Sequence, residues 1–451
     1  MNAPSTDVIV IGGGLSGLSA AVDMASHGLS VHLVERHQHL GGRAYSFVDD
    51  ATGEEIDNGQ HLMMGCYHQT RWLLHTIGSD HLASLQANLH IDFRHPEHGD
   101  ASLHCPSLPG PFHLLVGLVS LSTLSLPDRL KLLRIGLEIN RNPKAVEPSL
   151  ASLTVRQWLD SLGQSEEGKK YLWDIIAVGS LNGDPKEVSA LLFYRVLRAA
   201  FLGSRMNSSL LIPKVGLSRL FDEPGVRYIR AKKGDVSTGC AVEALIHGGA
   251  QVKAVLCSDG VKREARAFVC AVPWHAVSSL LPANEVATQA AERMTASPIL
   301  SIDLWFDQPV MDEEFVALLD SRVQWVFNRS KLLGSSPSSG QCLALTVSGA
   351  AELIDKEAAE LVAVAVNDLR RVFPRAGTAK VVHSVVLKER RATFSQRPDI
   401  ELLRPSCITS MENLFLAGDW TNTGYPATIE GAVMSGRKAA DAVAEFLSLR
   451  S

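Results

Sequence analysis

Apolar and polar residues alternate in recognisable blocks at the start of this 451-residue chain. Residues 7–11 begin with Asp7 and continue as an apolar run rich in β-branched side chains, which is typical of a strand buried on both faces. Residues 18–27 have a helical pattern that Gly28 ends, and residues 31–34 are apolar again and lead into Glu35. The N-terminal pattern therefore predicts a strand, a loop, a helix and a second strand.

The loop after the first strand is rich in glycine and has the spacing of a phosphate-binding turn. Gly12 permits the tight turn, Gly14 lets backbone N–H groups approach a pyrophosphate, and Gly17 lets the helix pack closely on the strand. The positive end of the helix attracts the phosphates, and Glu35 is placed to accept hydrogen bonds from a ribose. This unit predicts a dinucleotide-binding site, whose residues here are Gly12, Gly13, Gly14, Leu15, Ser16, Gly17 and Glu35.

A second glycine loop follows at residues 40–43, and its Arg43 can reach a pyrophosphate oxygen with its fixed fork of donors. The order of these motifs resembles that of the flavin amine oxidase and phytoene desaturase superfamily: Glu35 and Arg36 come first, and Gly42 and Arg43 follow. The resemblance implies that the dinucleotide is FAD, with these residues among its ligands.

The C-terminal region resembles the second flavin motif of the same superfamily. Residues 413–419 read as a short strand that ends in Gly418 and Asp419, and a helix is predicted from Ile429 to Leu447. The resemblance implies that Asp419 meets the ribityl and phosphate region. It also implies that the helix points its N-terminus, at Ile429, toward the pyrimidine end of the flavin, where the positive end stabilises charge on a reduced ring.

Strands are also predicted in the middle of the chain, at residues 236–246, 251–256 and 268–273. They resemble the third cofactor segment of the superfamily, in which Val242 would cap the adenine. We therefore predict an α/β fold with a discontinuous Rossmann-like FAD-binding domain and an inserted mixed α+β substrate domain, as in flavin amine oxidases. The predicted boundaries are 1–90, 215–285 and 400–451 for the FAD-binding domain, and 91–214 and 286–399 for the substrate domain.

The two insertions have different patterns. The first has helical periodicity, and the second alternates like strands before a final helix. The predicted helices of the first are 127–139, 155–162 and 189–201, and the second is predicted to hold strands 299–306 and 323–327 and a helix 350–373.

One apolar stretch, from Phe112 to Leu126, has two interpretations. A buried helix of the substrate domain is favoured, since the stretch is too short to span a membrane. The alternative is an entrance lip that dips into one leaflet, continued by the basic amphipathic segment with Arg129, Lys131 and Arg134.

Composition and charge restrict the kinds of protein that this chain can be. The net charge of −5 gives no electrostatic case for nucleic acid. Seven scattered cysteines without a C-x-x-C pair indicate a reducing compartment and no metal site. We expect a cytoplasmic protein, because no signal peptide precedes the first strand and no segment has the length of a membrane span.

Further motifs lie between the two flavin regions, at residues 57–66, 191–197, 297–299, 304–307, 324–327 and 391–394. Together they resemble the squalene-associated branch of the phytoene desaturase group, the hydroxysqualene dehydroxylases of bacterial hopanoid biosynthesis. The branch uses reduced FAD to replace the hydroxyl of hydroxysqualene with hydrogen, giving squalene. Gly59, Gln60 and His61 should then border the flavin.

Three function classes stay open at this point: a lipid oxidoreductase of the hydroxysqualene type, a carotenoid desaturase or amine oxidase, and a non-catalytic prenyl-binding escort protein. The intact Glu35, Arg43 and Asp419 argue against the third. His61 is the candidate proton donor, although packing against the cofactor is favoured for it, as for Trp420 and Tyr425. Because no second dinucleotide unit is visible, an external reductase or electron carrier is the expected partner, together with an isoprenoid lipid substrate and a membrane surface.

Overall fold

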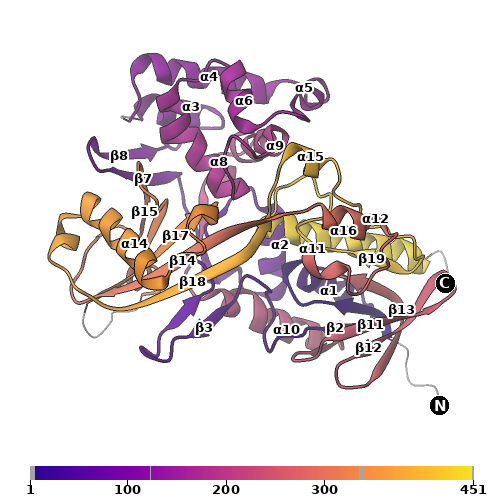
Figure 1. The fold of residues 1–451 in the computed structure, drawn as a ribbon. Helices are drawn as coiled ribbons and strands as arrows, with labels where there is room; N and C mark the ends of the chain where they lie inside the picture. Colours follow the sequence, from indigo (N-terminus) through magenta and orange to yellow (C-terminus); the bar gives the residue numbers. More distant parts are fainter. Residues whose placement is uncertain (1–5, 122, 335–339, 449–451) are drawn as a thin grey trace.

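The computed structural model describes residues 6–121, 123–334 and 340–448, and its architecture is mixed α/β. Two seven-stranded sheets lie side by side, and a helical region packs above the junction between them (Figure 1). The α/β fold class predicted from the sequence is confirmed. The division into five segments stays a prediction.

The first sheet brings together strands from both ends and the middle of the chain. Its parallel strands lie in the order β10, β2, β1, β13 and β19, and β12 and β11 continue antiparallel from β13. Parallel strands end at the same edge, so the loops that follow them meet there. The bounds are β1 Thr6–Ile11, β2 Val31–Val34, β10 Asp235–Ser237, β11 Val242–Gly248, β12 Gln251–Cys257, β13 Lys262–Cys270 and β19 Leu414–Leu416.

Two long helices cover one face of this sheet and pack on each other. They are α1 (Leu15–Ser26) and α16 (Ile429–Ser448). Their contact is close because Gly436 has no side chain: a Cβ there would lie 2.0 Å from Ser19 Oγ. The Ser19 hydroxyl in turn donates to the Val433 carbonyl at 3.0 Å. The first and last helices therefore present their N-termini to the same edge of the sheet.

The second sheet lies beside the first, on the other side of the molecule and below the helical region. Its order is β18-β14-β17-β16-β15-β7-β8, antiparallel except between β15 and β7. Helix α14 (Ala358–Val372) covers one face, and buried Leu361 and Leu369 pack there. The bounds are β7 His90–His95, β8 Gly99–His104, β14 Ala296–Phe306, β15 Phe315–Leu318, β16 Trp325–Asn328, β17 Gln341–Ser348 and β18 Val381–Phe394.

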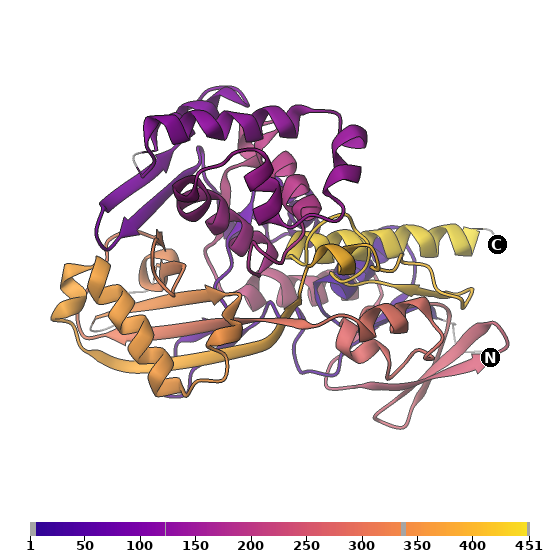
Figure 2. The same ribbon diagram turned by 45° about the horizontal axis from the view of Figure 1, so that its top comes forward.

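The helical region stands over the second sheet and reaches the first (Figure 2). Its core contains the edge-to-face pair Trp158 and Phe193, both buried. The region holds α3 Phe112–Ser120, α4 Leu126–Asn140, α5 Pro143–Leu150, α6 Val155–Ser161, α8 Asp174–Leu181 and α9 Ala190–Phe201. Smaller elements of the fold include α2 His68–Ile77, β3 Ser46–Val48, β4 Glu55–Asp57, α10 Glu223–Ala231 and α12 Val286–Glu292.

Three predicted elements are corrected by the structure. The strand predicted over 236–246 is two strands, β10 beside β2 and β11 beside β12, separated by a turn in which Gly239 has φ +66°. The helix predicted over 350–373 is a short 3₁₀ turn and then α14, which begins only at Ala358. Helix α1 begins at Leu15 rather than at residue 18.

The buried helix favoured for Phe112 to Leu126 is wrong. The stretch contains α3 and the first residue of α4, and one face of α3 is exposed: Phe112 is 59% exposed and Val116 46%. Ser122, within the stretch, lies outside the described residues. None of the described helices combines the length and apolar character needed to cross a membrane.

Candidate functional site

A cavity of about 1010 Å³ runs between the carboxyl edge of the first sheet, the second sheet and the helical region. One end is lined by the glycine loops and by the residues that follow β2 and β19. The other end is lined by apolar side chains of the helices and of β7, β8 and β16. The cavity therefore joins a polar, glycine-rich half to an apolar half.

The glycine-rich half has the shape of a phosphate cradle. Gly12 has φ +102°, and a Cβ there would lie 2.9 Å from the Ala271 carbonyl oxygen. A Cβ on Gly42 would lie 3.0 Å from the Gly14 Cα, so both backbones approach closely. No side chain caps the N-terminus of α1, and Leu15 and Ser16 of its first turn line the cavity. The N–H groups of this turn have no partner within the helix and can therefore bind an anion.

Glu35 lies in the cavity wall directly after β2, and it is 6% exposed. One carboxylate oxygen accepts from the Gly13 N–H at 2.6 Å, and the other from the His37 N–H at 2.8 Å. Gly13 itself is not among the lining residues, because its N–H is directed at Glu35. The carboxylate thus fixes the glycine loop and still borders the space predicted for a ribose.

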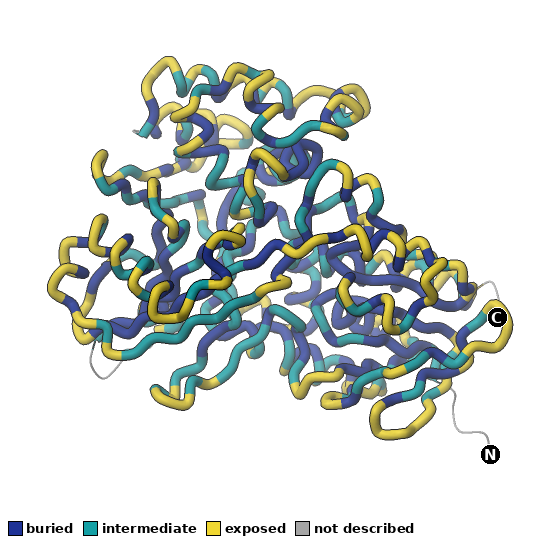
Figure 3. The backbone as a smooth tube through the Cα atoms, in the orientation of Figure 1, coloured by how far each residue is buried: buried dark blue, intermediate teal, exposed yellow. Residues whose placement is uncertain are grey.

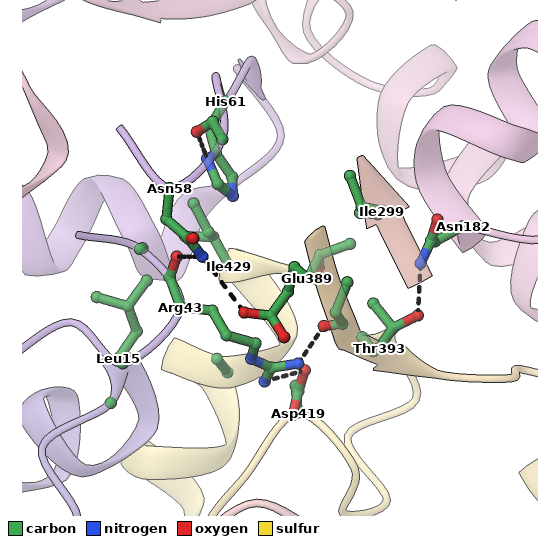
Figure 4. Close-up of a pocket in the computed structure, with 18 of the residues that line it drawn as sticks. Leu15, Arg43, Asn58, His61, Asn182, Ile299, Glu389, Thr393, Asp419 and Ile429 are labelled. Atoms are coloured by element: carbon green, nitrogen blue, oxygen red, sulfur yellow. Dashed lines mark hydrogen bonds and ion pairs between the residues drawn. The ribbon is translucent and has the colours of Figure 1, made fainter. Parts of the chain in front are cut away.

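Arg43 and Asp419 form an ion pair across the two flavin motifs (Figure 4). Arg43 Nη2 lies 2.7 Å from Asp419 Oδ2, and Arg43 Nη1 donates to the Ala392 carbonyl. Asn58 donates to the Arg43 carbonyl at 3.2 Å and to Glu389 Oε2 at 3.5 Å. The pair places a guanidinium in the cavity wall, where it can also meet a phosphate.

Cationic side chains gather at the mouth of this half. Arg391 Nη1 lies 3.0 Å from His275 Nδ1, and both residues line the cavity. Burial lowers the pKa of His275, and the nearby charges of Arg391, Arg43 and Arg36 lower it further. Glu389 opposes this shift, but the lining here has more basic than acidic side chains, so this end of the cavity is net positive, as a pyrophosphate site requires. The basic ones are Arg36, Arg43, Lys388, Arg390 and Arg391, and the acidic ones are Glu35, Glu389 and Asp419.

The segment after β4 borders the cavity as predicted from the sequence. A Cβ on Gly59 would lie 3.0 Å from Ser301 Oγ of β14, so the segment is held against the second sheet. His61 Nδ1 lies 2.6 Å from the Gly59 carbonyl oxygen. Because a carbonyl only accepts, Nδ1 carries the proton, and burial lowers the His61 pKa. The neutral ring then offers Nε2 as an acceptor, which favours a packing role over proton donation.

The remaining predicted site residues fall into two groups. Gln60, Val242, Gly418 and Ile429 line the cavity, and so does Trp420, whose Nε1 donates to the Val272 carbonyl at 3.0 Å. Tyr425 and Gly17 lie outside the lining. Gly17 serves the packing of α1, since a Cβ there would lie 1.9 Å from the Gly12 carbonyl oxygen.

These observations fit FAD. The glycine cradle, the uncapped α1 N-terminus and the electropositive mouth suit a pyrophosphate. Glu35 and Val242 border the side where β2 and β11 lie, and Ile429 starts α16 at the other side. A dinucleotide held here would be contacted by the loop between β1 and α1, near the start of the chain, and by the start of α16, near its end.

The apolar half of the cavity is large and carries little charge. Its lining includes Leu89, Ile91, Phe93, Leu103, Leu114, Leu118, Leu172, Ile175, Ile176, Leu197, Phe201, Trp325 and Phe327. The acidic residues of the lining are Glu35, Glu389 and Asp419, all in the cofactor half. Among the described residues, therefore, no carboxylate of the lining lies in the apolar half to pair with a cationic substrate.

Tyr67 is a lining residue that the sequence argument missed. Its phenol hydrogen-bonds with Thr428, the residue before α16, and both line the cavity. Burial raises the pKa of Tyr67, and the nearby Cys66 and Glu430 raise it further. The phenol is therefore a neutral hydrogen-bond donor beside the start of α16.

One group outside the cavity has metal-ligand chemistry among the described residues. Atoms of Cys240, Cys257 and Asp259 lie within 4.8 Å of one another. Both carboxylate oxygens of Asp259 are bound by Arg263, at 3.1 and 2.5 Å. The guanidinium occupies the carboxylate and its charge opposes a bound cation, so the prediction of no metal is retained.

The fold and this site define a flavin-dependent oxidoreductase, and comparison with known proteins agrees. The model of the family described as flavin containing amine oxidoreductase matches residues 15–444. The chain belongs to this family, and its cofactor is FAD.

Relatives with two different names match almost the whole chain. The chain is 31% identical to a hydroxysqualene dehydroxylase of Rhodopseudomonas palustris, over 97% of this chain and 98% of the relative. It is 26% identical to a zeta-carotene desaturase of Synechocystis, over 97% and 96%. Among solved structures, a redesigned putrescine oxidase superposes with a TM-score of 0.73 over 99% of this chain and 100% of that chain, at 18% identity. The last comparison supports the fold alone.

Proposed function

We propose that this protein is an FAD-dependent hydroxysqualene dehydroxylase, which replaces the hydroxyl group of hydroxysqualene with hydrogen and forms squalene. The observation that carries the proposal is the long apolar half of the cavity, which opens directly onto the flavin cradle. The relatives at about 30% identity that bear this activity in their names support it.

The cavity favours a lipid over an amine. An ammonium group that leaves water needs a carboxylate partner, and the three acidic residues of the lining are in the cofactor half. Two of these, Glu35 and Asp419, are already bonded to Gly13 and Arg43. An uncharged isoprenoid chain needs only apolar contact, which Leu114, Phe201 and their neighbours offer.

The proposed reaction breaks one C–O bond and forms one C–H bond. The hydroxyl group takes a proton and leaves as water, and reduced FAD supplies the hydride that the carbon receives. Tyr67 is the better hydrogen-bond donor to the leaving hydroxyl, because its phenol is neutral and His61 presents an acceptor. The proton and the hydride together are the two hydrogens that reduced FAD gives up. The apolar walls exclude bulk water, so hydride transfer competes well with hydrolysis of the delocalised cation.

The flavin must be reduced again after each turnover. We propose an external reductase or electron carrier, since the chain has one dinucleotide unit. Stopped-flow mixing with NADPH alone tests this part, and rapid bleaching of the flavin would contradict it. A cytoplasmic location at the surface of the membrane belongs to the same proposal, because the substrate is a lipid.

A carotenoid desaturase is the second candidate, supported by the 26% identity to the zeta-carotene enzyme. The two candidates differ in the direction of electron flow. Anaerobically reduced protein is incubated with hydroxysqualene, and oxidised protein with phytoene or zeta-carotene, and the products are identified by mass spectrometry. We expect squalene from the first mixture; a desaturated carotenoid from the second, without squalene from the first, would favour the other candidate.

A further inference from the structure

The outer surface of α3 and α4 carries a dense apolar face, which we call the α3–α4 face. It comprises eight side chains: Phe112, Leu115, Val116, Val119, Leu126, Leu130, Leu133 and Leu137, between 39% and 71% exposed. They are eight of the fifteen large apolar side chains that are exposed among the described residues. A patch of this density on a folded protein marks a contact surface.

Both helices of the face are amphipathic, and they contact each other. The α3 members recur at steps of three and four, and so do the α4 members. The opposite sides point inward, with Leu114 on α3 and Leu132 and Ile135 on α4 buried. Arg129 ties the helices together by donating to the Val119 carbonyl at 2.8 Å. In Figure 3 the outer side of this region is largely coloured as exposed.

The charge around the face is positive, although the whole chain is negative. Residues 112–145 contain five basic side chains, Arg129, Lys131, Arg134, Arg141 and Lys144, and two acidic ones, Asp128 and Glu138. Lys131 pairs with Asp128 at 3.0 Å and Arg141 with Glu138 at 2.9 Å, so the excess charge is that of Arg129, Arg134 and Lys144. The chain as a whole has a net charge of −5. An apolar face flanked by basic residues complements a surface that is anionic outside and apolar within, which describes a lipid leaflet with acidic headgroups.

Helix α3 also forms part of the cavity wall. Leu114 and Leu118 of α3 line the cavity whose other end holds Asp419 and Ile429, while Leu115 and Val119 face outward. Only one layer of helix therefore separates the exposed face from the apolar half of the cavity. An apolar molecule that leaves a bilayer at this face would not need to cross open water.

We infer that the α3–α4 face docks on an anionic lipid bilayer and admits the apolar substrate to the cavity past α3. The inference rests on the proposed lipid substrate for its second part, whereas bilayer docking follows from the face itself. The helices lie on the surface of the bilayer and do not cross it, since α3 has 9 residues and α4 has 15.

Vesicle flotation of the FAD-loaded protein tests the docking. The vesicles contain phosphatidylcholine with or without phosphatidylglycerol, and no substrate is added. The variant Leu130→Asp/Leu137→Asp changes two side chains that are 64% and 71% exposed. The control Val286→Asp/Val382→Asp changes two that are 67% and 64% exposed but lie elsewhere, on α12 and β18. Flavin content and melting temperature verify that each variant is folded.

We expect the wild type and the control to float with the anionic vesicles, and the α3–α4 variant to bind at least tenfold less. Binding should also weaken on neutral vesicles and in high salt. No flotation of the wild type, or equal flotation of the two variants, would overturn the inference. A wild-type dimer that the α3–α4 variant alone makes monomeric would identify a second copy as the occupant instead.

Substrate entry is tested separately from docking. With hydroxysqualene in vesicles, the α3–α4 variant should react at least tenfold more slowly than the control, and with substrate in detergent micelles the two should react alike. Equal rates from vesicles would refute entry past α3. Because flotation uses no substrate, docking can hold even where the proposed reaction fails.

Discussion

Removal of the Glu35 carboxylate should lower both the stability of the apoprotein and its affinity for FAD. In Glu35→Ala the buried Gly13 N–H loses a bond of 2.6 Å to a charged acceptor, and the His37 N–H loses one of 2.8 Å. A buried donor left without a partner costs about 1–3 kcal/mol. Gly13 is buried and incurs this cost, whereas His37 lies at the surface, where water can replace the lost acceptor.

We therefore expect the free energy of unfolding of the Glu35→Ala apoprotein to fall by about 1–3 kcal/mol. The dissociation constant of FAD should rise by a further five- to 150-fold, roughly, because the predicted ribose contact is lost as well. Glu35→Gln keeps one accepting oxygen and should fall between wild type and Ala. Urea unfolding of the apoproteins and titration with FAD measure the two effects.

Glu243→Ala is the matched control, because Glu243 is an exposed glutamate on β11 of the same sheet. It should change neither quantity. If Glu35→Ala unfolds at the wild-type urea concentration, the Gly13 bond has no energetic role. If it also binds FAD normally, the assignment of the adenosine end is wrong.

Three further outcomes follow from the site. Asp419→Ala leaves Arg43 without its partner at 2.7 Å and should raise the FAD dissociation constant by about five- to 150-fold, measured from flavin fluorescence on release; full flavin retention would exclude the Asp419 contact. Tyr67→Phe should slow flavin reoxidation by hydroxysqualene by roughly 10²-fold or more at unchanged flavin content, whereas Tyr425→Phe, outside the lining, should not; equal rates would remove Tyr67 from the chemistry. Burial lowers the pKa of His61 below its ordinary 6.5, so the unfolded chain takes up the proton first and stability falls as the pH drops below about 6.5, by at most about 1.4 kcal/mol per pH unit. His61→Gln should reduce that slope in urea unfolding between pH 7.5 and 5.5, and an unchanged slope would contradict the lowered pKa of the ring.

The cofactor half of the site could be predicted from the sequence, because its signals are local. The first glycine loop, Glu35 and Gly418 each come just after a parallel strand, and parallel strands carry the residues that follow them to one edge whatever their separation in the chain. Gly12, Glu35 and Gly418 meet there for that reason.

The missed features depend on contacts between distant segments. Tyr67 and Thr428 lie 361 positions apart and carry no motif, so nothing in their spacing indicates a hydrogen bond. Glu389 borders the cavity from the long strand β18, whose sequence gives no sign of which side faces the flavin. The α3–α4 face was ambiguous because periodicity shows that a helix is amphipathic but not what covers its apolar side. The sequence does indicate where α4 begins, because Ser125 is a favourable N-cap residue and Pro127 follows it. In the structure the Ser125 side chain accepts from the Asp128 N–H.

Single-turnover stopped-flow spectroscopy is the decisive test of hydroxysqualene dehydroxylation, because it follows the flavin and the product of one reaction. Protein reduced anaerobically is mixed with hydroxysqualene, and the return of the oxidised flavin band is compared with the squalene extracted at each time. We predict that the flavin is oxidised without oxygen and that one squalene forms for each flavin oxidised. A flavin that stays reduced with hydroxysqualene, in protein whose oxidised flavin is bleached by a carotenoid or an amine, would contradict it.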